Sequence, residues 1–514
     1  MNERHDVVVV GAGPVGLMLA CELRLGGVDV LVVERLTEPD LTIKAGAINV
    51  PTAQAFARRG LLPDLLAEQS TALARFTQFQ RAAGVPGDGH RQVLTAGKRP
   101  AVGHFAGIML DASLIDFDDP VFADVGPAGE AFLVSQQAIE AILARRAAEL
   151  GVPVRRGVDV TGLWDDGDTV TVRCGDSLVH AGWVVGCDGG RSTIRKLAEF
   201  EFPGLDAEIT GHQGMVEMTG TEGLRPGWNT TPTGIYAHGP FPGRFLTVEL
   251  DGPPADRDAP LTAQELQDSL RHVSGVDVTI TAVHSATRFT DNTRQVPDYR
   301  KGRVLLAGDA AHVHSPFGGQ GLNLGVGDAV NLGWKLASVV RGDAPAPLLD
   351  TYSSERHPIG AWVLEWTRAQ VALMRLDPRS KALREVASQL FATRDGATTI
   401  FKKISGVLHR YDLGGNHPLT GGPTPDLELA DGTHLADHCT SGTPILLDLT
   451  DSPDLRATAA PWSHRIQTLT AKPAQPRELS ALLIRPDGIV AWAADTPTST
   501  GLPEALTRWF GTPA

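Results

Sequence analysis

The chain has few cysteines, and those it has are widely separated. Cys21, Cys174, Cys187 and Cys439 are the four cysteines in 514 residues, and no two of them form a C-x-x-C motif. This spacing argues against a disulfide framework, a thiolate zinc site and a dithiol redox pair. We therefore expect four buried free thiols.

Long apolar runs and an excess of positive charge are also lacking. No apolar run is long enough to span a bilayer, and the start, MNERHDVVVVGAG, enters a β-branched run without the layout of a signal peptide. We therefore expect a cytoplasmic chain. The formal net charge of −14 disfavours nucleic acid and anionic membranes as partners, because both would repel the chain. A small molecule is the expected partner, and the chain is expected to be a monomer or a homodimer.

Metal ligands at a suitable spacing are scarce too. His312 and His314 form an H-x-H pair, but no cluster of acids or histidines elsewhere in the sequence supports it. Alternate residues of an extended segment also share a face for packing reasons alone. We expect no metal site.

The length and composition are those of a multidomain globular protein. A chain of 514 residues is too long for a single core, so two or three domains are expected. Apolar residues make up 42% and charged residues 21% of the chain, which is typical of globular domains.

The N-terminus has the pattern of a dinucleotide-binding unit. An apolar run, Asp6 to Val10, is followed by Gly11-Ala12-Gly13-Pro14-Val15-Gly16 and by helical spacing from Leu17 to Leu25. The first glycine of G-x-G-x-x-G permits the turn, the second lets the backbone approach a pyrophosphate, and the third allows close helix packing. A second apolar run, Val28 to Val33, ends at Glu34, near the spacing expected for a carboxylate on a ribose hydroxyl. This acid favours FAD or NAD over NADP.

Two further strand-to-helix turns carry an acid at the end of the strand. Trp183 to Gly186 leads to Asp188, and the segment from Gly302 to Leu336 contains a short strand, Gly308-Asp309, a glycine loop and a helix. Free N–H groups at such helix starts favour anions. Helical spacing also predicts helices at 52–59, 136–150 and 323–336, and a hairpin from 154–163 and 169–173, whereas 71–130 is expected to form loops and strands.

Three motifs resemble those of the flavin-dependent aromatic hydroxylases of the para-hydroxybenzoate-hydroxylase class. They are GAGPVG at 11–16, CDGGRSTIRK at 187–196 and GRVLLAGDAAHVHSPFGGQGLNLGVGDAVNLGWKL at 302–336. The resemblance is closest to the three-domain branch that hydroxylates aromatic polyketides and rifamycin-like antibiotics. YSSERHP at 352–358, PWSHRI at 461–466 and ALLIRPDGIVAWAA at 481–494 support that branch. The resemblance covers nearly the whole chain but is faint at 71–130 and 200–290.

The resemblance implies an α/β fold with three domains. A discontinuous Rossmann-like FAD-binding domain would comprise residues 1–70, 131–199 and 291–375. A middle β-sheet domain for the substrate would comprise 71–130 and 200–290, and a thioredoxin-like domain would occupy 395–514. Because that last region contains only Cys439, its thioredoxin likeness is expected to be structural rather than redox-active.

The resemblance also implies which residues bind the cofactor. Glu34 is expected at the adenosine ribose, and Asp309 at the ribityl–pyrophosphate region. Asp188 and Arg195 resemble a second fingerprint that is linked to FAD and to the nicotinamide cofactor. Pro316 and the segment Gly319 to Asn323 are expected to line the isoalloxazine. The expected set is Gly11, Gly13, Pro14, Val15, Gly16, Glu34, Arg35, Lys44, Gln136, Val160, Asp188, Arg195, Gly308, Asp309, Pro316, Gly319, Gln320, Gly321, Leu322 and Asn323.

One position departs from the pattern of the family. Relatives usually carry an arginine in a phrase like SRALG, where this chain has Lys44 in TIKAGA, and Pro51 stands where another arginine is common. Lysine supplies charge without the planar bidentate fork of arginine. A Baeyer–Villiger, epoxidising or ring-rearranging reaction on a similar substrate is therefore the alternative to hydroxylation.

The implied chemistry is the oxygenation of an aromatic ring. NAD(P)H would dock transiently to reduce FAD, because no second G-x-G-x-x-G occurs. O₂ would then form a C4a-hydroperoxyflavin, which passes oxygen to a polycyclic, polyketide-type phenol or quinone in antibiotic biosynthesis or modification, in a site that excludes water. A non-catalytic FAD-fold binding protein is the alternative from another class. No catalytic acid or base is evident. Candidates for the substrate pocket, for which ordinary sheet core is an equal explanation, are Trp228, Tyr236, His238, Phe241 and Phe245.

Overall fold

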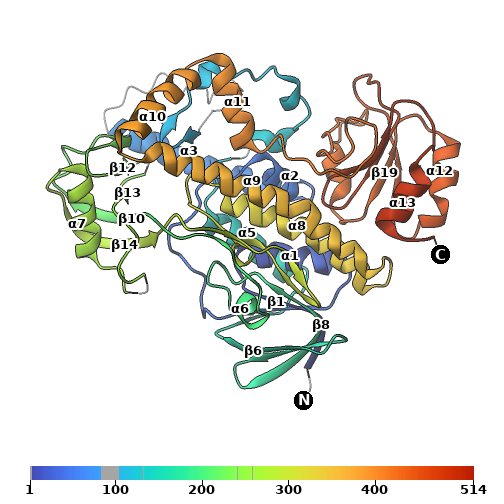
Figure 1. Cartoon of the computed structure of the whole chain (residues 1–514). Helices are drawn as coiled ribbons and strands as arrows, with labels where there is room; N and C mark the ends of the chain where they lie inside the picture. The colour runs from blue at the N-terminus through green and yellow to red at the C-terminus, as the bar shows by residue number, and fades with distance from the viewer. Residues whose placement is uncertain (1–2, 83–102, 131, 240, 258, 514) are drawn as a thin grey trace.

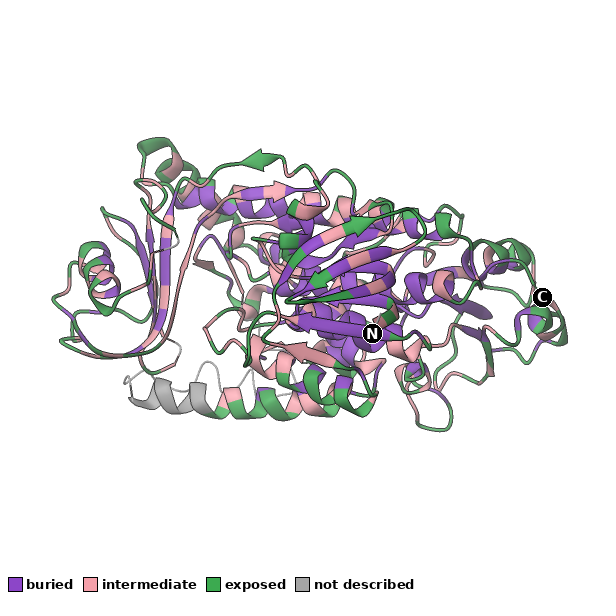
Figure 2. Cartoon of the chain, turned by 90° about the horizontal axis from the view of Figure 1, so that it is seen from below, coloured by how far each residue is buried: buried purple, intermediate pink, exposed green. Residues whose placement is uncertain are grey.

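The computed structural model describes residues 3–82, 103–130, 132–239, 241–257 and 259–513. Three regions lie side by side in Figure 1: an α/β region near the N-terminus, a β-sheet region with one flanking helix, and a compact C-terminal region. Figure 2 shows that buried residues concentrate in the strands of the α/β region and in the helices packed on them. This mixed architecture confirms the fold class that the sequence predicts.

A mostly parallel sheet forms the α/β region. Its strands are Glu3–Val10 (β1), Val30–Glu34 (β2), Val154–Arg156 (β5), Val160–Asp165 (β6), Val170–Cys174 (β7), Ser177–Gly186 (β8), Arg300–Lys301 (β16) and Val304–Leu306 (β17). They follow the order β16–β17–β8–β1–β2–β5, and the β6–β7 hairpin joins β8. β17, β8, β1, β2 and β5 pair in parallel, so their carboxyl ends lie at one edge of the sheet.

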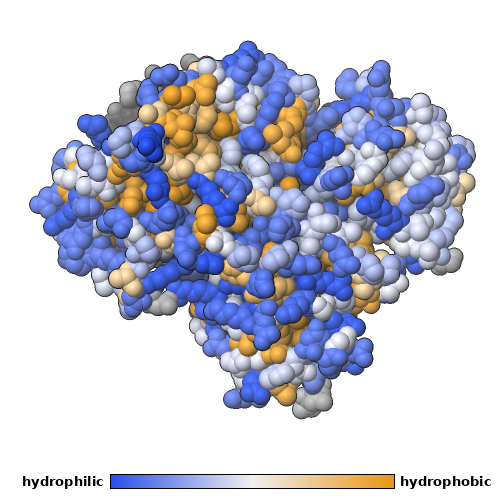
Figure 3. All heavy atoms as spheres, in the orientation of Figure 1, coloured by the Kyte–Doolittle hydropathy of each residue, from blue (hydrophilic) through white to orange (hydrophobic). Residues whose placement is uncertain are grey.

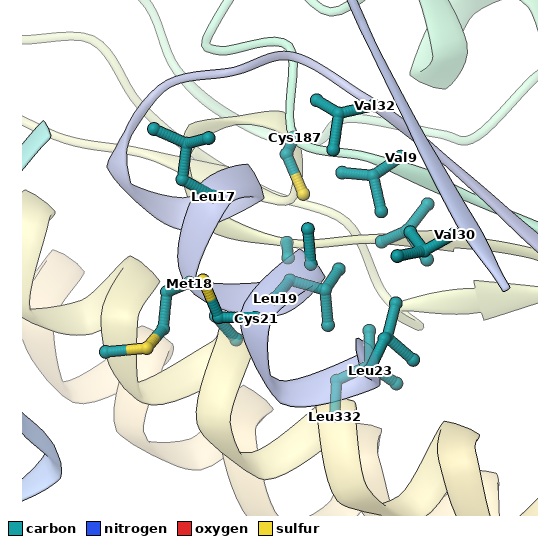
Figure 4. Close-up of a cluster of buried hydrophobic side chains, with 14 of the residues drawn as sticks. Val9, Leu17, Met18, Leu19, Cys21, Leu23, Val30, Val32, Cys187 and Leu332 are labelled. Atoms are coloured by element: carbon teal, nitrogen blue, oxygen red, sulfur yellow. The ribbon is translucent and has the colours of Figure 1, made fainter. Parts of the chain in front are cut away.

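The helix α1 (Pro14–Leu25) packs between this sheet and α8 (Gly321–Val340). Figure 4 shows Leu17, Leu19 and Leu23 of α1 among valines of β1 and β2 and Leu332 of α8. All three leucines are buried, and burial of each such side chain contributes about 1.5–3 kcal/mol. The other helices and 3-10 turns of this part of the chain are Val50–Ala57 (α2), Leu62–Ala82 (α3), Pro127–Glu130 (η3), Gln136–Glu149 (α5), Thr193–Leu197 (α6) and Gly308–Ala310 (η4).

The helix α3 differs from the sequence-based expectation. We expected loops and strands from Thr71 onwards, but α3 continues to Ala82. Its residues are good helix formers but lack a strong apolar stripe, so hydrophobic periodicity does not predict this helix. Gln69 anchors the helix: its amide donates to the Glu130 carbonyl at 2.8 Å and accepts from the Phe132 N–H at 2.8 Å.

An antiparallel sheet forms the second region. Its strands, in the order β11–β12–β13–β10–β14, are Gly227–Thr230 (β11), Ile235–His238 (β12), Arg244–Glu249 (β13), Thr210–Thr219 (β10) and Thr279–Phe289 (β14). The helix α7 (Ala263–Ser274) covers one face through Leu266 and Leu270. Smaller elements join this region to the first; they are Gly204–Leu205 (β9), Thr293–Gln295 (β15), His312–Val313 (β18), His104–Phe105 (β3), Ile108–Met109 (β4), Ala112–Leu114 (η1) and Pro120–Phe122 (η2).

Long helices connect the sheets with the C-terminal region. They are Asp350–Met374 (α9), Pro378–Phe391 (α10) and Arg394–Ser405 (α11), preceded by Ala346–Leu349 (η5). Figure 3 shows apolar side chains gathered on the face near α9 and α10. Leu383, Val386 and Leu390 of α10 are 56%, 53% and 58% exposed. Among the described residues, no helix is long and apolar enough to cross a membrane.

The C-terminal region has the topology of a thioredoxin fold. Its elements are Leu435–Cys439 (η6), Ile445–Asp448 (β19), Pro453–Ala459 (α12), Ala460–Trp462 (η7), Gln467–Thr470 (β20), Ala481–Ile484 (β21), Val490–Ala494 (β22) and Leu502–Phe510 (α13). The sheet order is β20–β19–β21–β22, with β19 and β20 parallel and the other two pairs antiparallel. Cys439 is buried and unpaired, as are the other three cysteines, which confirms the expectation of free thiols.

Buried charges fasten this C-terminal region to α8 and α9. The Arg485 guanidinium donates to both carboxylate oxygens of Glu355 on α9, at 2.9 and 2.7 Å, and also pairs with Asp487. Lys335 of α8 reaches the same Glu355 carboxylate at 2.9 Å. Burial lowers the pKa of Lys335 to about 7, so Arg485 is the permanent cation of the cluster.

We expect Arg485→Met to lower the free energy of unfolding by about 3–5 kcal/mol, because two buried carboxylates would lose their shared cation. The measurement is the urea midpoint followed by tryptophan fluorescence, since Trp509 lies against Arg485. Arg477→Met is the matched control. Arg477 also pairs the C-terminal region with another part of the chain, through Asp124 after η2, but both side chains are more than a third exposed, so a loss of about 1 kcal/mol or less is expected. Equal losses in the two variants would contradict the argument.

Candidate active site

The three predicted motifs meet at the carboxyl edge of the parallel sheet. Gly11 follows β1, Asp188 follows β8, and Gly308 follows β17, and these three strands are neighbours. A Cβ atom on Gly11 would lie 2.4 Å from the Cys187 carbonyl oxygen, so the first two turns touch. The Val15 side chain lies 3.0 Å from a Cβ on Gly308, so the third turn packs on the first.

The glycines of the first motif have different surroundings. Gly11 has φ +108°, and Gly16 has no room for a side chain, because its Cβ would lie 1.9 Å from the Gly11 carbonyl oxygen. These two glycines are required by the chain itself. A Cβ on Gly13 would meet no atom within 4 Å. Gly13 precedes Pro14 at the start of α1 and supplies no side-chain cap for the first N–H groups of that helix.

Glu34 orders the same turn. One carboxylate oxygen accepts from the Ala12 N–H at 2.7 Å, and the other accepts from the Leu36 N–H at 2.9 Å. Glu34 is half-buried, and each of its oxygens keeps acceptor capacity for a hydroxyl group. This is the arrangement expected of a ribose-binding acid. Arg35, the next residue, is exposed.

Asp188 and Arg195 are both used within the second motif. The Asp188 carboxylate accepts from the Ser192 hydroxyl at 2.5 Å and from the Thr193 N–H at 2.6 Å, which caps α6. Arg195 is buried, and its guanidinium donates to the Ala310 carbonyl at 2.8 Å. Arg195 therefore braces the turn that carries Asp309 against the second motif.

The third motif presents Asp309 on a fixed turn. Asp309 lies in η4 and is exposed, and among the described residues none donates a hydrogen bond to its carboxylate. The turn itself is held by Asp328 of α8, whose carboxylate accepts from the Gly308 N–H at 3.0 Å and from His312 Nε2 at 2.7 Å. Asp328 was missed in the sequence, because no local pattern distinguishes a buried acid inside a helix.

The glycine loop combines a fixed base with an open tip. Gln370 of α9 donates to the Phe317 carbonyl at 3.2 Å, and a Cβ on Gly318 would lie 2.8 Å from the same amide. Gly319 has φ +63° and no atom within 4 Å of a Cβ. Pro316 is exposed, whereas Gln320 and Leu322 are buried and face the interior. Asn323 closes the loop: its amide donates to the Gly319 carbonyl at 2.8 Å, and its oxygen accepts from the Asn49 N–H.

Lys44 lies in a segment that crosses from the α/β region to the antiparallel sheet. Its ammonium pairs with Asp40 at 2.7 Å. Burial tends to raise the pKa of Asp40, but hydrogen bonds from Lys44 and Thr42 outweigh it and lower that pKa to about 2. The Gln136 N–H donates to the Ala45 carbonyl at 2.9 Å, which brings the start of α5 to this segment. Val160, in contrast, is a buried residue of the sheet core.

The predicted substrate residues divide between the two faces of the antiparallel sheet. Trp228 pairs with Ala237 in the register and belongs to the cluster that contains Phe317 of the glycine loop. Tyr236 is buried in the cluster under α7, on the opposite face. His238 and Phe245 are cross-strand partners that share the α7 side, because side chains alternate along a strand. Phe241 is half-buried in the β12–β13 connection.

A hairpin that sequence reasoning missed completes the wall next to the glycine loop. The His104 ring of β3 lies 4.6 Å from the Trp228 ring, and Trp228 meets Phe317 edge-on at 6.3 Å. Phe289 of β14 meets Phe317 at 6.0 Å. No Asn-Gly or Asp-Gly signal marks this hairpin, since its turn residues are Ala106 and Gly107.

The two histidines of the H-x-H pair have separate partners. His312 Nε2 contacts the Asp328 carboxylate, and His314 Nδ1 donates to the Ser315 carbonyl at 2.8 Å. Within the part of the chain that the structure describes, no group of three or more His, Cys, Asp or Glu side chains is arranged to hold a metal ion.

Comparison with known proteins identifies the class to which this fold and site belong. The family model described as "FAD binding domain" matches residues 4–367, and that described as "Aromatic-ring hydroxylase, C-terminal" matches residues 417–513. The chain therefore belongs to the family of FAD-dependent aromatic-ring hydroxylases. It is a flavin-dependent monooxygenase, and FAD is its cofactor.

Several relatives are similar over the full length. A 12-dehydrotetracycline 5-monooxygenase/anhydrotetracycline 6-monooxygenase of Streptomyces rimosus is 41% identical over 99% of this chain and 100% of its own. A rifampicin monooxygenase of Streptomyces venezuelae is 39% identical over 98% of both chains. The solved structure of the anhydrotetracycline hydroxylase OxyS from Streptomyces rimosus superposes with a TM-score of 0.86 at 38% identity, and covers 99% of this chain and 100% of that one.

The residues at the sheet edge fit FAD on physical grounds. The starts of α1 and α8 both lack a side-chain cap, so two sets of free N–H groups are available to a pyrophosphate. Gly13 and Gly319 leave space that a Cβ would fill. The carboxylates of Glu34 and Asp309 would offer acceptors to hydroxyl groups of such a cofactor.

We expect Gly13→Ala to weaken FAD binding on the order of tenfold or more, because the methyl group would occupy the approach of the pyrophosphate. The apoprotein should lose only about 1 kcal/mol of stability, the cost of alanine at a helix N-cap. Gly11→Ala should instead lose about 2 kcal/mol or more, because its Cβ would meet the Cys187 carbonyl oxygen at 2.4 Å. FAD titration of the deflavinated chain and urea unfolding measure the two effects. Unchanged FAD affinity in Gly13→Ala would contradict the assignment.

Proposed function

We propose that this chain uses NAD(P)H and O₂ to oxygenate a polycyclic, polyketide-type aromatic phenol or quinone, in antibiotic biosynthesis or modification. The observation that carries the proposal is the contact of Trp228 with Phe317, which joins an aromatic wall of the antiparallel sheet to the glycine loop at the flavin site. The tetracycline and rifampicin activities of the relatives support a large, oxygen-bearing aromatic substrate. We also propose the cytoplasm as its location, where its four free cysteines stay reduced.

The residues proposed for the FAD site fall into two groups: those that would contact the cofactor and those that fix the turns around it. The bound flavin supplies the activation of oxygen and its transfer to the ring. The Gly13 and Gly319 backbones would let the cofactor approach closely, and the Asp309 and Glu34 carboxylates would accept hydrogen bonds from its hydroxyl groups. Asp188 and Arg195 serve this site by fixing the turns around it, since their polar atoms are bonded within the protein.

The side chains of the proposed substrate wall exclude water. Trp228, Phe289 and Phe317 present ring faces and edges to one another, which leaves few polar groups at which water would bind. A pocket without water protects reactive intermediates from hydrolysis and strengthens each hydrogen bond made inside it. Residues 71–130 and 200–290 are proposed as the substrate domain, residues 1–70, 131–199 and 291–375 as the FAD domain, and residues 395–514 as the C-terminal domain.

The experiment that tests this function measures cofactor, turnover and product together. The purified chain should be yellow and should consume NAD(P)H faster when a polycyclic phenol such as 2-naphthol or a dihydroxyanthraquinone is added. Mass spectrometry should find one added oxygen with the rings intact. A lactonised or opened ring would instead support the Baeyer–Villiger or rearranging alternative that the lysine at position 44 leaves open. A chain that cannot be reconstituted with FAD would rule the proposal out.

Substitutions on the two faces of the antiparallel sheet should affect the KM for the aromatic substrate differently. Trp228→Leu should raise KM for the aromatic substrate by about tenfold and divert NAD(P)H oxidation towards H₂O₂, because a pocket wall of large buried area is lost. Tyr236→Phe lies under α7 and should leave KM within about twofold, since it loses only a neutral hydrogen bond from the Arg225 N–H. Initial rates and peroxide yield measure both. A larger effect at Tyr236 would place the substrate on the other face.

A further inference from the structure

The His104 ring is linked to Phe317 of the glycine loop through one side chain, that of Trp228. It packs on Trp228 at 4.6 Å between ring centroids with an interplanar angle of 50°, and Trp228 in turn contacts Phe317. His104 keeps part of its surface accessible. It is thus a polar group within an otherwise apolar wall, which is the usual composition of a small-molecule site.

The position of the hydrogen atom on this ring is set by the hairpin. The Gly107 N–H donates to His104 Nδ1 at 3.1 Å, so Nδ1 is an acceptor and carries no hydrogen. Burial, with a smaller contribution from Arg384, lowers the pKa of His104 to about 4, so the ring is neutral at pH 7. The single ring hydrogen therefore sits on Nε2. Among the described residues, none accepts a hydrogen bond from this N–H.

The hairpin that carries His104 is held from three sides. The Ala106 N–H donates to the Gln370 side-chain oxygen at 3.0 Å, and Arg384 donates to the Ala106 carbonyl at 2.6 Å. Ala106 has φ +53°, an uncommon conformation for a residue with a side chain. A Cβ on Gly107 would lie 3.2 Å from Trp228, so the turn packs directly on the tryptophan. Gln370 also bonds the Phe317 carbonyl, so one side chain sets the hairpin and the flavin loop relative to each other.

We propose that His104 is a substrate-binding residue that donates a hydrogen bond from Nε2 to a phenol, phenolate or quinone oxygen of the aromatic substrate. This inference rests on the proposed function and adds the group that orients the ring. A fixed N–H in an apolar wall selects a ring that carries an oxygen over one that does not, because an unoxygenated ring would cover the donor without giving it a partner. It also stabilises negative charge on that oxygen, which makes the ring more electron-rich for oxygen transfer.

The test compares two probes that differ by one hydroxyl group, 2-naphthol and naphthalene. Their Kd values for the holoenzyme are measured without NAD(P)H, from the perturbation of the flavin absorbance spectrum. The wild-type chain should bind 2-naphthol about threefold to tenfold more tightly than naphthalene, the range of one hydrogen bond between neutral groups. In His104→Phe, which keeps a ring against Trp228, that ratio should fall to about one while the Kd of naphthalene stays the same.

Two further variants separate the donor from the packing. His104→Asn keeps an acceptor for the Gly107 N–H but has no group at the position of Nε2, so it should also lose the preference. His104→Gln retains an N–H of similar reach and should restore part of it. His284→Phe, at an exposed histidine paired with Glu217, is the control and should behave as wild type. Flavin content and circular dichroism establish that each variant folds.

Equal binding of the two probes by the wild-type chain, or an unchanged ratio in both His104→Phe and His104→Asn, would overturn the role of His104. An equal loss of affinity for both probes in these variants would reveal a packing role and would also overturn it. Failure of the proposed function is distinct: 2-naphthol would then bind with its normal preference but neither stimulate NAD(P)H oxidation nor gain oxygen.

Discussion

The buried carboxylate of Asp328 is the constraint on which the flavin site depends. A charge inside a protein is tolerated only when it is fully paired, and here three donors from different elements converge on it. They are the Gly308 N–H, His312 Nε2 and the Arg356 guanidinium of α9, the last at 2.8 Å. Burial alone would raise the pKa of Asp328, but the charges of His312 and Arg356 keep it low. The acid thus fixes the η4 turn to α8 and α9 at once, and Asp309 is an exposed residue of that turn.

The same helix pair explains what the C-terminal region contributes. Glu355 and Arg356 are neighbours on α9, and each belongs to a separate buried network. Arg356 holds Asp328 and donates to the Tyr411 hydroxyl at 3.0 Å, whereas Glu355 receives Arg485 from the thioredoxin-like fold. Arg59, paired with Glu22, adds hydrogen bonds to the Cys439 and Pro486 carbonyls. The one cysteine of this region is buried, and its thiol donates to the Leu435 carbonyl at 3.4 Å. The region therefore contributes through its buried contacts with α8 and α9.

The sequence predicts the elements of the flavin edge well, because each is a local pattern. Gly11, Asp188 and Asp309 each follow an apolar strand and precede a helix, and parallel strands bring their carboxyl ends together without further information. The proposed substrate wall is different. Trp228 and Tyr236 are equally aromatic and lie close in sequence, but the strand register puts them on opposite faces, and only the pairing of β11 with β12 decides which one meets Phe317. His104 depends on contacts with Gln370, Arg384 and Trp228, all distant in the chain, so no local signal could reveal it.

The two sides of the site also differ in how firmly they are held. The base of the glycine loop tolerates little change, since Gly318 abuts Gln370 and Asn323 is bonded in two directions. The crossing segment around Lys44 is held by the partly exposed Lys44–Asp40 pair and by hydrogen bonds, such as that from the Ser285 hydroxyl to the Leu41 carbonyl and that from the Ile43 N–H to the same hydroxyl. Exposed pairs contribute little to stability, so this segment is the part of the site that sequence can change at low cost. Under the proposed function, the fixed glycine loop would stay the same for different ring systems, whereas the segment around Lys44 and the aromatic wall would change with the substrate.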